Sequence, residues 1–189
     1  MRYPLVELLT AAVFVALTLR FVDQLEVLPA FLWIGAVGVA LTLIDLDVRR
    51  LPDALTLPSY PVAAVLLGLA ALVGPGTGAM ARVLLGGLAL FALYFTLWFF
   101  THGRGMGLGD VKLAGLLGAY LAWLGWGTLA AGAFGGFLLG GVTSLALLMI
   151  GRAGRKTKIP FGPFMLAGAL LAILVGQPLI DGYRQFTGV

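Results

Sequence analysis

Residues 113–151, LAGLLGAYLAWLGWGTLAAGAFGGFLLGGVTSLALLMIG, contain no charged side chain. About 20 largely apolar residues cross the hydrocarbon core of a bilayer as one helix. This run therefore accommodates two spans, and its central GWG segment supplies the turn that divides them. The rest of the 189-residue chain has the same character, since 61% of its residues are hydrophobic and 11% are charged, against about 25% charged in soluble domains. The sequence predicts an integral membrane protein.

Five further breaks in apolar character predict an all-α, polytopic membrane helical bundle that forms a single domain over residues 1–189. We expect about seven transmembrane helices, at residues 4–21, 28–46, 54–73, 80–101, 110–125, 127–150 and 160–179. The first segment carries Glu7 and lacks a clear small-residue cleavage site. We interpret it as a retained span rather than a cleaved signal peptide.

The positions of the basic residues predict how the bundle is oriented, because short loops rich in Lys and Arg stay on the cytoplasmic side. With the N-terminus in the cytoplasm, only Arg20, Arg82 and Arg184 lie outside. The basic residues on the cytoplasmic side are then Arg2, Arg49, Arg50, Arg104, Lys112, Arg152, Arg155, Lys156 and Lys158. The net charge of +4 is explained by this asymmetry, so we expect the lipid bilayer as a partner and no nucleic acid.

The same orientation brings four carboxylates, those of Asp45, Asp47, Asp53 and Asp110, to the cytoplasmic face. Asp45 ends the second predicted span in IDLDVRRLPD (44–53), and Asp110 opens the fifth in GMGLGDVK (105–112). Carboxylates at the edge of hydrocarbon are costly and usually functional. Two that face each other share one proton, so one acts as a general base toward water and the other as an acid. This is the chemistry of aspartic proteolysis.

Glycines precede Asp110, and they fit that chemistry in two ways. They permit backbone conformations that other residues avoid, and they leave room for an extended peptide to approach the main chain. The alternatives are structural. Asp53 is interpreted as the N-cap of the third helix, Asp47 as an interfacial acid near Arg49 and Arg50, and Asp110 as a helix cap favoured by the helix dipole.

A second functional class also remains open at this point. Small proton- or cation-coupled transporters use carboxylates in glycine-rich membrane helices, but they place them near the bilayer midplane. A scaffold that keeps the glycines for packing is a third interpretation. The chain has no cysteine and a single histidine, His102, so we expect no disulfide, no metal site and no cofactor.

At these acidic segments the sequence resembles the type IV prepilin leader peptidases, membrane aspartic proteases with a Gly-x-Gly-Asp motif. The resemblance extends over four blocks in the same order, RYPLVELLTA (2–11), IDLDVRRLPDALTLP (44–58), GMGLGDVKLAGLLGAYLAW (105–123) and KIPFGPFMLAG (158–168). It implies that Asp45 and Asp110 form the catalytic pair. It further implies cleavage of prepilins of type IV pili, or of type II secretion pseudopilins, after the glycine that ends a short basic leader, on the cytoplasmic side of the bacterial inner membrane.

The resemblance also suggests a substrate-binding surface made by Gly107, Gly109, Asp47, Asp53 and Lys112, in which the acids attract the basic leader. The sequence departs from the family pattern in two respects. Many members carry a cysteine-containing segment linked to N-methylation; this chain has no cysteine and starts at the RYPLVELLTA block, so we expect a protease core and no methyltransferase activity. Arg104 stands where an acid often precedes the GMG residues.

Overall fold

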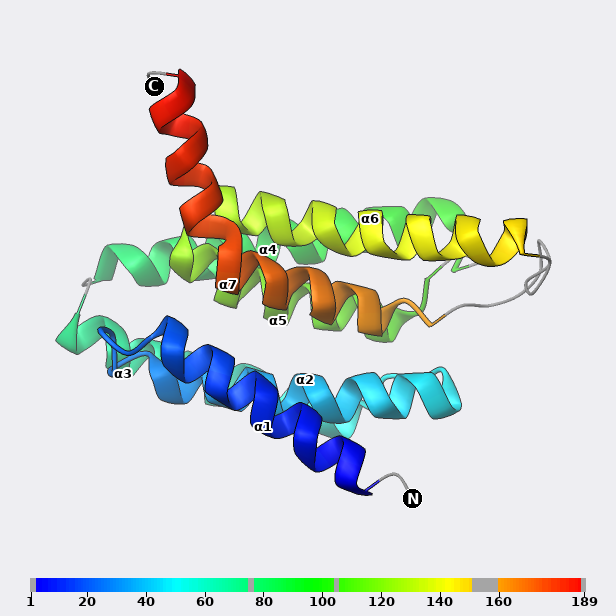
Figure 1. Ribbon diagram of the computed structural model, residues 1–189, viewed down its shortest axis with the longest axis horizontal. Coiled ribbons are helices and arrows are strands. Elements are labelled where there is room, and N and C mark those ends of the chain that lie inside the picture. Colours follow the sequence, from blue (N-terminus) through cyan, green and yellow to red (C-terminus); the bar gives the residue numbers. More distant parts are fainter. Residues whose placement is uncertain (1–2, 75–76, 104–105, 151–159, 188–189) are drawn as a thin grey trace.

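The computed structural model describes residues 3–74, 77–103, 106–150 and 160–187, with the backbone alone at Thr77 and from residue 176 onward. The described residues form helices and no strand, and most of the helices run roughly along the long axis of the molecule, whereas the C-terminal part of α7 turns away from it (Figure 1). The seven helices are α1 (Tyr3–Arg20), α2 (Leu28–Val48), α3 (Asp53–Val73), α4 (Thr77–Thr101), α5 (Leu108–Leu124), α6 (Trp126–Met149) and α7 (Gly162–Thr187). The predicted all-helical bundle is confirmed.

Five of these helices, α1, α2, α3, α4 and α6, are long and apolar enough to cross a membrane. The other two helices, α5 and α7, have shorter apolar segments among the described residues. The central helix α5 has 17 residues, and the apolar part of α7 covers Gly162–Val175. Most residues of α5 are buried, although its first residue, Leu108, is 47% exposed.

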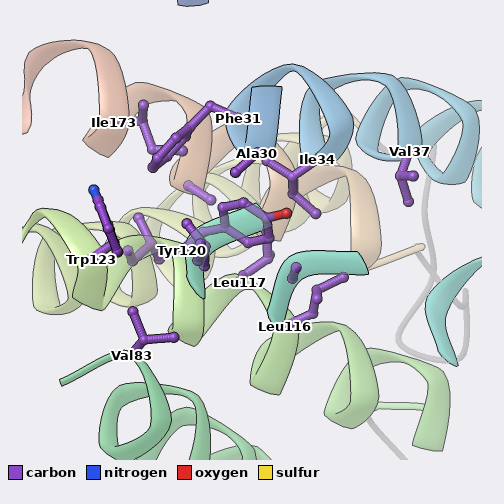
Figure 2. Packing of buried hydrophobic residues seen from close by; sticks show 14 of the residues in the cluster. Ala30, Phe31, Ile34, Val37, Val83, Leu116, Leu117, Tyr120, Trp123 and Ile173 are labelled. Carbon is purple, nitrogen blue, oxygen red and sulfur yellow. The ribbon is translucent and has the colours of Figure 1, made fainter. Parts of the chain in front are cut away.

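Helix α5 forms the centre of the bundle and contacts α3, α4, α6 and α7. Figure 1 shows α1, α2 and α3 gathered on one side of the molecule and α4, α6 and α7 on the other. Because α5 is apolar on every face, nearly all of its side chains are buried. Figure 2 shows Tyr120 of α5 beside Phe31 of α2, with the two ring centroids 5.4 Å apart in an edge-on arrangement.

Glycines let α5 and its neighbours approach closely, as small residues do at helix contacts in membranes. A Cβ atom added to Gly118 of α5 would lie 2.5 Å from the carbonyl oxygen of Gly86 in α4. The glycines at every fourth position of α6 are buried, and a Cβ on Gly136 would lie 3.2 Å from Cα of Met165 in α7. The regularly spaced glycines of α6 therefore form a packing face.

Both ends of α5 are tied to neighbouring helices by side chains that bond its carbonyl groups. Arg82 of α4 donates from Nε to the Ala122 carbonyl at 2.7 Å and from Nη2 to the Trp123 carbonyl at 2.8 Å. At the other end, Tyr60 Oη of α3 donates to the Lys112 carbonyl at 2.6 Å. The last carbonyls of a helix have no partner within it, so Arg82 caps the C-terminal end of α5.

An apolar groove of about 580 Å³ lies between α3, α4 and α5. Its walls include Leu57 and Leu67 of α3, Leu88 of α4 and Gly115 of α5. Lys112, two residues after Asp110, belongs to the same lining. The groove thus begins one helical turn from the acidic segment and extends along the bundle.

Candidate active site

Asp45 lies in the last turn of α2 and is 4% exposed. Its Oδ2 atom accepts a hydrogen bond of 3.1 Å from the backbone N–H of Gly162, the first residue of α7. A Cβ atom on Gly162 would lie only 2.8 Å from that oxygen. A glycine is therefore required for the start of α7 to approach the carboxylate, and the positive end of the helix dipole faces the acid.

The chain turns sharply after Asp45 because α2 ends in a left-handed residue. Arg49 has φ 55° and ψ 41°, and its N–H donates to the Asp45 carbonyl at 2.9 Å. Pro52 then directs the chain into α3 with an extended conformation. Residues 49–52 consequently form a short connection at the same end of the bundle as Asp45.

Asp110 is in the first turn of α5 and is 9% exposed. Its Oδ2 atom accepts a 2.9 Å hydrogen bond from the N–H of Gly107, and its own N–H donates to the Gly107 carbonyl at 3.2 Å. This reciprocal arrangement caps the helix, as the sequence predicted. The cap holds the Asp110 carboxylate at the start of α5.

The residues beside the two acids both pack against Leu51. A Cβ on Gly109, next to Asp110, would lie 2.9 Å from Leu51 Cβ, and a Cβ on Gly162, next to Asp45, would lie 3.2 Å from Leu51 Cδ2. Asp110 is also within range of the charge on Asp45. The end of α2 and the starts of α5 and α7 thus converge, and both predicted catalytic acids are buried at this junction.

The glycines of the motif act differently from the prediction. Gly107 has φ −84° and ψ 160°, which any residue adopts, and Gly109 lies inside α5. The expectation that they supply unusual backbone conformations is wrong for these two. What Gly109 supplies is room for Leu51. A Cβ on Gly107 would lie 3.5 Å from Asp110 Oδ2, an ordinary contact.

Asp53 is paired with Lys112 rather than acting as an N-cap. The cap position of α3 is Pro52, and Asp53 is the first helical residue, so the N-cap prediction was wrong. Lys112 Nζ lies 2.7 and 2.8 Å from the two Asp53 oxygens, with the side chains 32% and 56% exposed. Exposed pairs contribute about 0–1 kcal/mol. The pair links the starts of α3 and α5 weakly.

The other predicted residues lie around this junction or outside the described chain. Asp47 is exposed in the last turn of α2. His102 follows α4 with φ 52°. Arg104, Gly105 and the basic segment 151–159 lie outside the described residues.

Sequence reasoning missed three residues that shape the site, namely Gly162, Leu51 and Tyr94. Gly162 lies in the KIPFGPFMLAG block, which was the signal available for it. Tyr94 of α4 is 1% exposed and within electrostatic range of Asp110. Its ring centroid is 6.2 Å from that of Phe161, the residue before Gly162. Aromatic packing therefore joins α4 to the start of α7 beside the acids.

The sequence model of the type IV leader peptidase family matches residues 31–176 of this chain. The chain belongs to this family. The matched residues include Asp45, Asp110 and Gly162, so all the parts of the junction fall within the leader peptidase region. The resemblance recognised from the sequence is confirmed.

Curated relatives extend the match to nearly the whole chain. It is 38% identical over 185 residues to the prepilin leader peptidase/N-methyltransferase of Aeromonas hydrophila, covering 96% of this chain and 61% of that protein. For the proteins of the same name from Pseudomonas aeruginosa and Bacillus subtilis, the identities are 35% over 193 residues and 33% over 181 residues. The alignments cover 99% and 96% of this chain, and 63% and 69% of those relatives.

The chain thus spans about three fifths of the length of the Aeromonas and Pseudomonas relatives. No solved structure matches it.

Proposed function

We propose that this chain is an aspartic endopeptidase that removes the basic leader from type IV prepilins or pseudopilins, cutting after the glycine that ends the leader. One observation carries the proposal. Asp45 and Asp110, from segments 65 residues apart in the sequence, are both buried at one junction of three helix ends in a chain of the leader peptidase family.

The mechanism follows from the arrangement of the two acids. Two carboxyl groups close together in a poorly solvated place hold one proton between them. The ionised acid takes a proton from water, and the resulting hydroxide attacks the carbonyl carbon of the glycine while the protonated acid donates to its oxygen. The first acid then gives the proton it took from water to the amine nitrogen, the C–N bond breaks, and the second acid takes back a proton from a hydroxyl of the collapsing tetrahedral intermediate.

The backbone N–H groups of Gly162 and Gly107 hold the two carboxylates in position for this sequence of steps. Each bond is accepted by Oδ2 of its aspartate. Backbone donors on helix starts are rigid, so the acids need little reorganisation during the reaction. Loss of either donor lowers the rate without removing the carboxyl group.

We place the junction on the cytoplasmic face of the bacterial inner membrane. Arg49, Arg50 and Lys112 accompany the acids at this end, which agrees with the distribution of basic residues in membrane proteins. At the opposite end, Arg82 and Arg20 donate to backbone carbonyls of α5 and α7. Those two arginines have a structural reason to be there, so they do not weigh against this orientation.

The groove between α3, α4 and α5 supports a role for a substrate that stays in the membrane. It is lined by apolar side chains and begins at Lys112, one turn beyond Asp110. The hydrophobic helix that follows the leader lies in this groove, and the leader junction reaches the two acids. Gly87 and Gly115 also line the groove, but their small size serves the contact between α4 and α5, since a Cβ on Gly87 would lie 3.0 Å from the Gly115 carbonyl oxygen.

The exposed acids Asp47 and Asp53 attract the basic leader. The ion pair with Lys112 partly neutralises Asp53. Gly107 leaves room for the extended peptide beside Asp110. Replacement of Gly107 by Ala is expected to leave folding unchanged, because the nearest atom to the new Cβ is 3.5 Å away, and to raise KM for a peptide substrate.

The test is cleavage of a peptide with a basic leader, a glycine and an apolar helix by the purified chain in lipid nanodiscs. Asp45→Asn and Asp110→Asn are each expected to lower kcat by about 10³-fold or more. Asp23→Asn is the matched control, since Asp23 is exposed beyond the end of α1, at the opposite end of the bundle. Full cleavage by either active-site variant would reject the pair. Proton or cation transport without cleavage would favour a transporter instead.

A further inference from the structure

The side chain of Leu51 packs against residues that neighbour both acids. Its Cβ faces Gly109, the neighbour of Asp110, and its Cδ2 faces Gly162, the residue that donates to Asp45. The side chain therefore packs between the residue next to Asp110 and the residue that donates to Asp45. It is partly exposed, so one face borders the space that a substrate enters from the membrane surface.

Leu51 leaves little room for a Cβ atom on either of the two glycines that it faces. A Cβ at Gly109 would be 2.9 Å from Leu51 Cβ, and one at Gly162 would be 3.2 Å from Leu51 Cδ2. Contacts of this length force a neighbour to move, and overpacking of this kind costs about 1–3 kcal/mol. Both enzyme positions that face Leu51 are glycines for this reason.

A substrate meets the same restriction. Its scissile carbonyl must lie between the two carboxyl groups, since one directs the water and the other donates to the carbonyl oxygen. A carbonyl held in that position belongs to a residue close to Leu51, which packs against the neighbours of both acids. A Cβ on that residue competes with Leu51 for space, whereas a glycine does not.

We propose that Leu51 determines substrate specificity by restricting the residue before the scissile bond to glycine. The inference rests on the proposed peptidase function. It assigns the restriction to the connection between α2 and α3, and it makes no use of the charges on the leader. Shortening Leu51 opens the space and relaxes the restriction, without changing the two carboxyl groups.

The experiment compares two peptides that differ only in glycine or alanine at the last leader residue. The ratio of kcat/KM for the glycine peptide to that for the alanine peptide is measured in nanodiscs. One added methyl group is typically discriminated by about 10- to 200-fold, and we expect wild-type enzyme to fall in this range. Leu51→Ala is expected to reduce the ratio by about fivefold or more, and Leu51→Val to reduce it by a smaller amount in the same direction.

Leu72→Ala is the matched control, because Leu72 is 78% exposed at the far end of α3; it should retain the wild-type ratio. A ratio unchanged in both Leu51 variants, even with lower activity on both peptides, would overturn the inference, since a structural role affects the two peptides equally. If wild-type enzyme fails to cut the glycine peptide, the proposed function is rejected and this inference with it.

Discussion

Replacement of Gly162 by Ala tests whether the start of α7 positions Asp45. The added Cβ would lie 2.8 Å from Asp45 Oδ2 and 3.2 Å from Leu51 Cδ2. Ordinary contacts with a Cβ begin near 3.4 Å, so the carboxylate and the helix start must separate by about half an ångström. The 3.1 Å hydrogen bond from the Gly162 N–H then lengthens beyond the usual range.

The size of the effect follows from that bond. A hydrogen bond to a charged group contributes about 1.5–3 kcal/mol, and about 1.4 kcal/mol corresponds to a tenfold change in rate. If the bond holds Asp45 in its reactive position, its loss lowers kcat by about 10- to 150-fold. The variant keeps both carboxyl groups, so its residual rate should stay above that of Asp45→Asn.

The assay is peptide cleavage under saturating substrate, with thermal unfolding followed in the same nanodiscs. Gly141→Ala is the matched control: Gly141 lies in α6, and an added Cβ there meets nothing within 4 Å of the described structure. It should cleave at the wild-type rate. A Gly162→Ala enzyme that also cleaves at the wild-type rate, while Asp45→Asn is inactive, would refute the positioning role of α7.

Three further substitutions are predicted. Gly109→Ala should lower thermal stability and activity together, because its Cβ would lie 2.9 Å from Leu51 Cβ and 3.3 Å from the Leu51 carbonyl; wild-type melting behaviour would contradict this packing. Lys112→Gln should lower KM for a peptide with a basic leader, because it releases the Asp53 carboxylate from its ion pair. The effect should be smaller at high salt, since exposed charges are screened. An unchanged KM at low salt would exclude Asp53 from leader binding. Tyr120→Phe should keep or raise the unfolding temperature, because Tyr120 Oη is buried without a hydrogen-bond partner among the described residues; a marked loss of stability would point to a partner.

The fold was predictable from the sequence because its signals are local. Apolar runs, the turns between them and the glycine spacing of α6 each depend on neighbouring residues. Most of the helices begin and end within a few residues of the predicted limits, whereas α7 extends to Thr187, beyond the predicted limit at residue 179. The acids at the ends of α2 and α5 were equally visible, because a carboxylate beside a long apolar run is rare.

The shape of the site was less predictable because it depends on residues far apart in the chain. The bond between Gly162 and Asp45 joins positions 117 residues apart, and no local pattern indicates which helix start faces which acid. Asp53 looked like an N-cap because it precedes an apolar run, but the pairing with Lys112 depends on α3 and α5 lying side by side. The close contacts of Gly109 with Leu51 are likewise tertiary.

The bond between α7 and Asp45 has a consequence for biogenesis. Helices enter the membrane in the order in which they are synthesised, and the N–H that holds Asp45 belongs to the last of the seven helices. Until α7 inserts, Asp45 lacks this donor and the Leu51 connection lacks one of its walls. A nascent chain in which α1–α6 have inserted without α7 therefore lacks the donor that holds Asp45, and the proposed peptidase activity requires α7 to be in place.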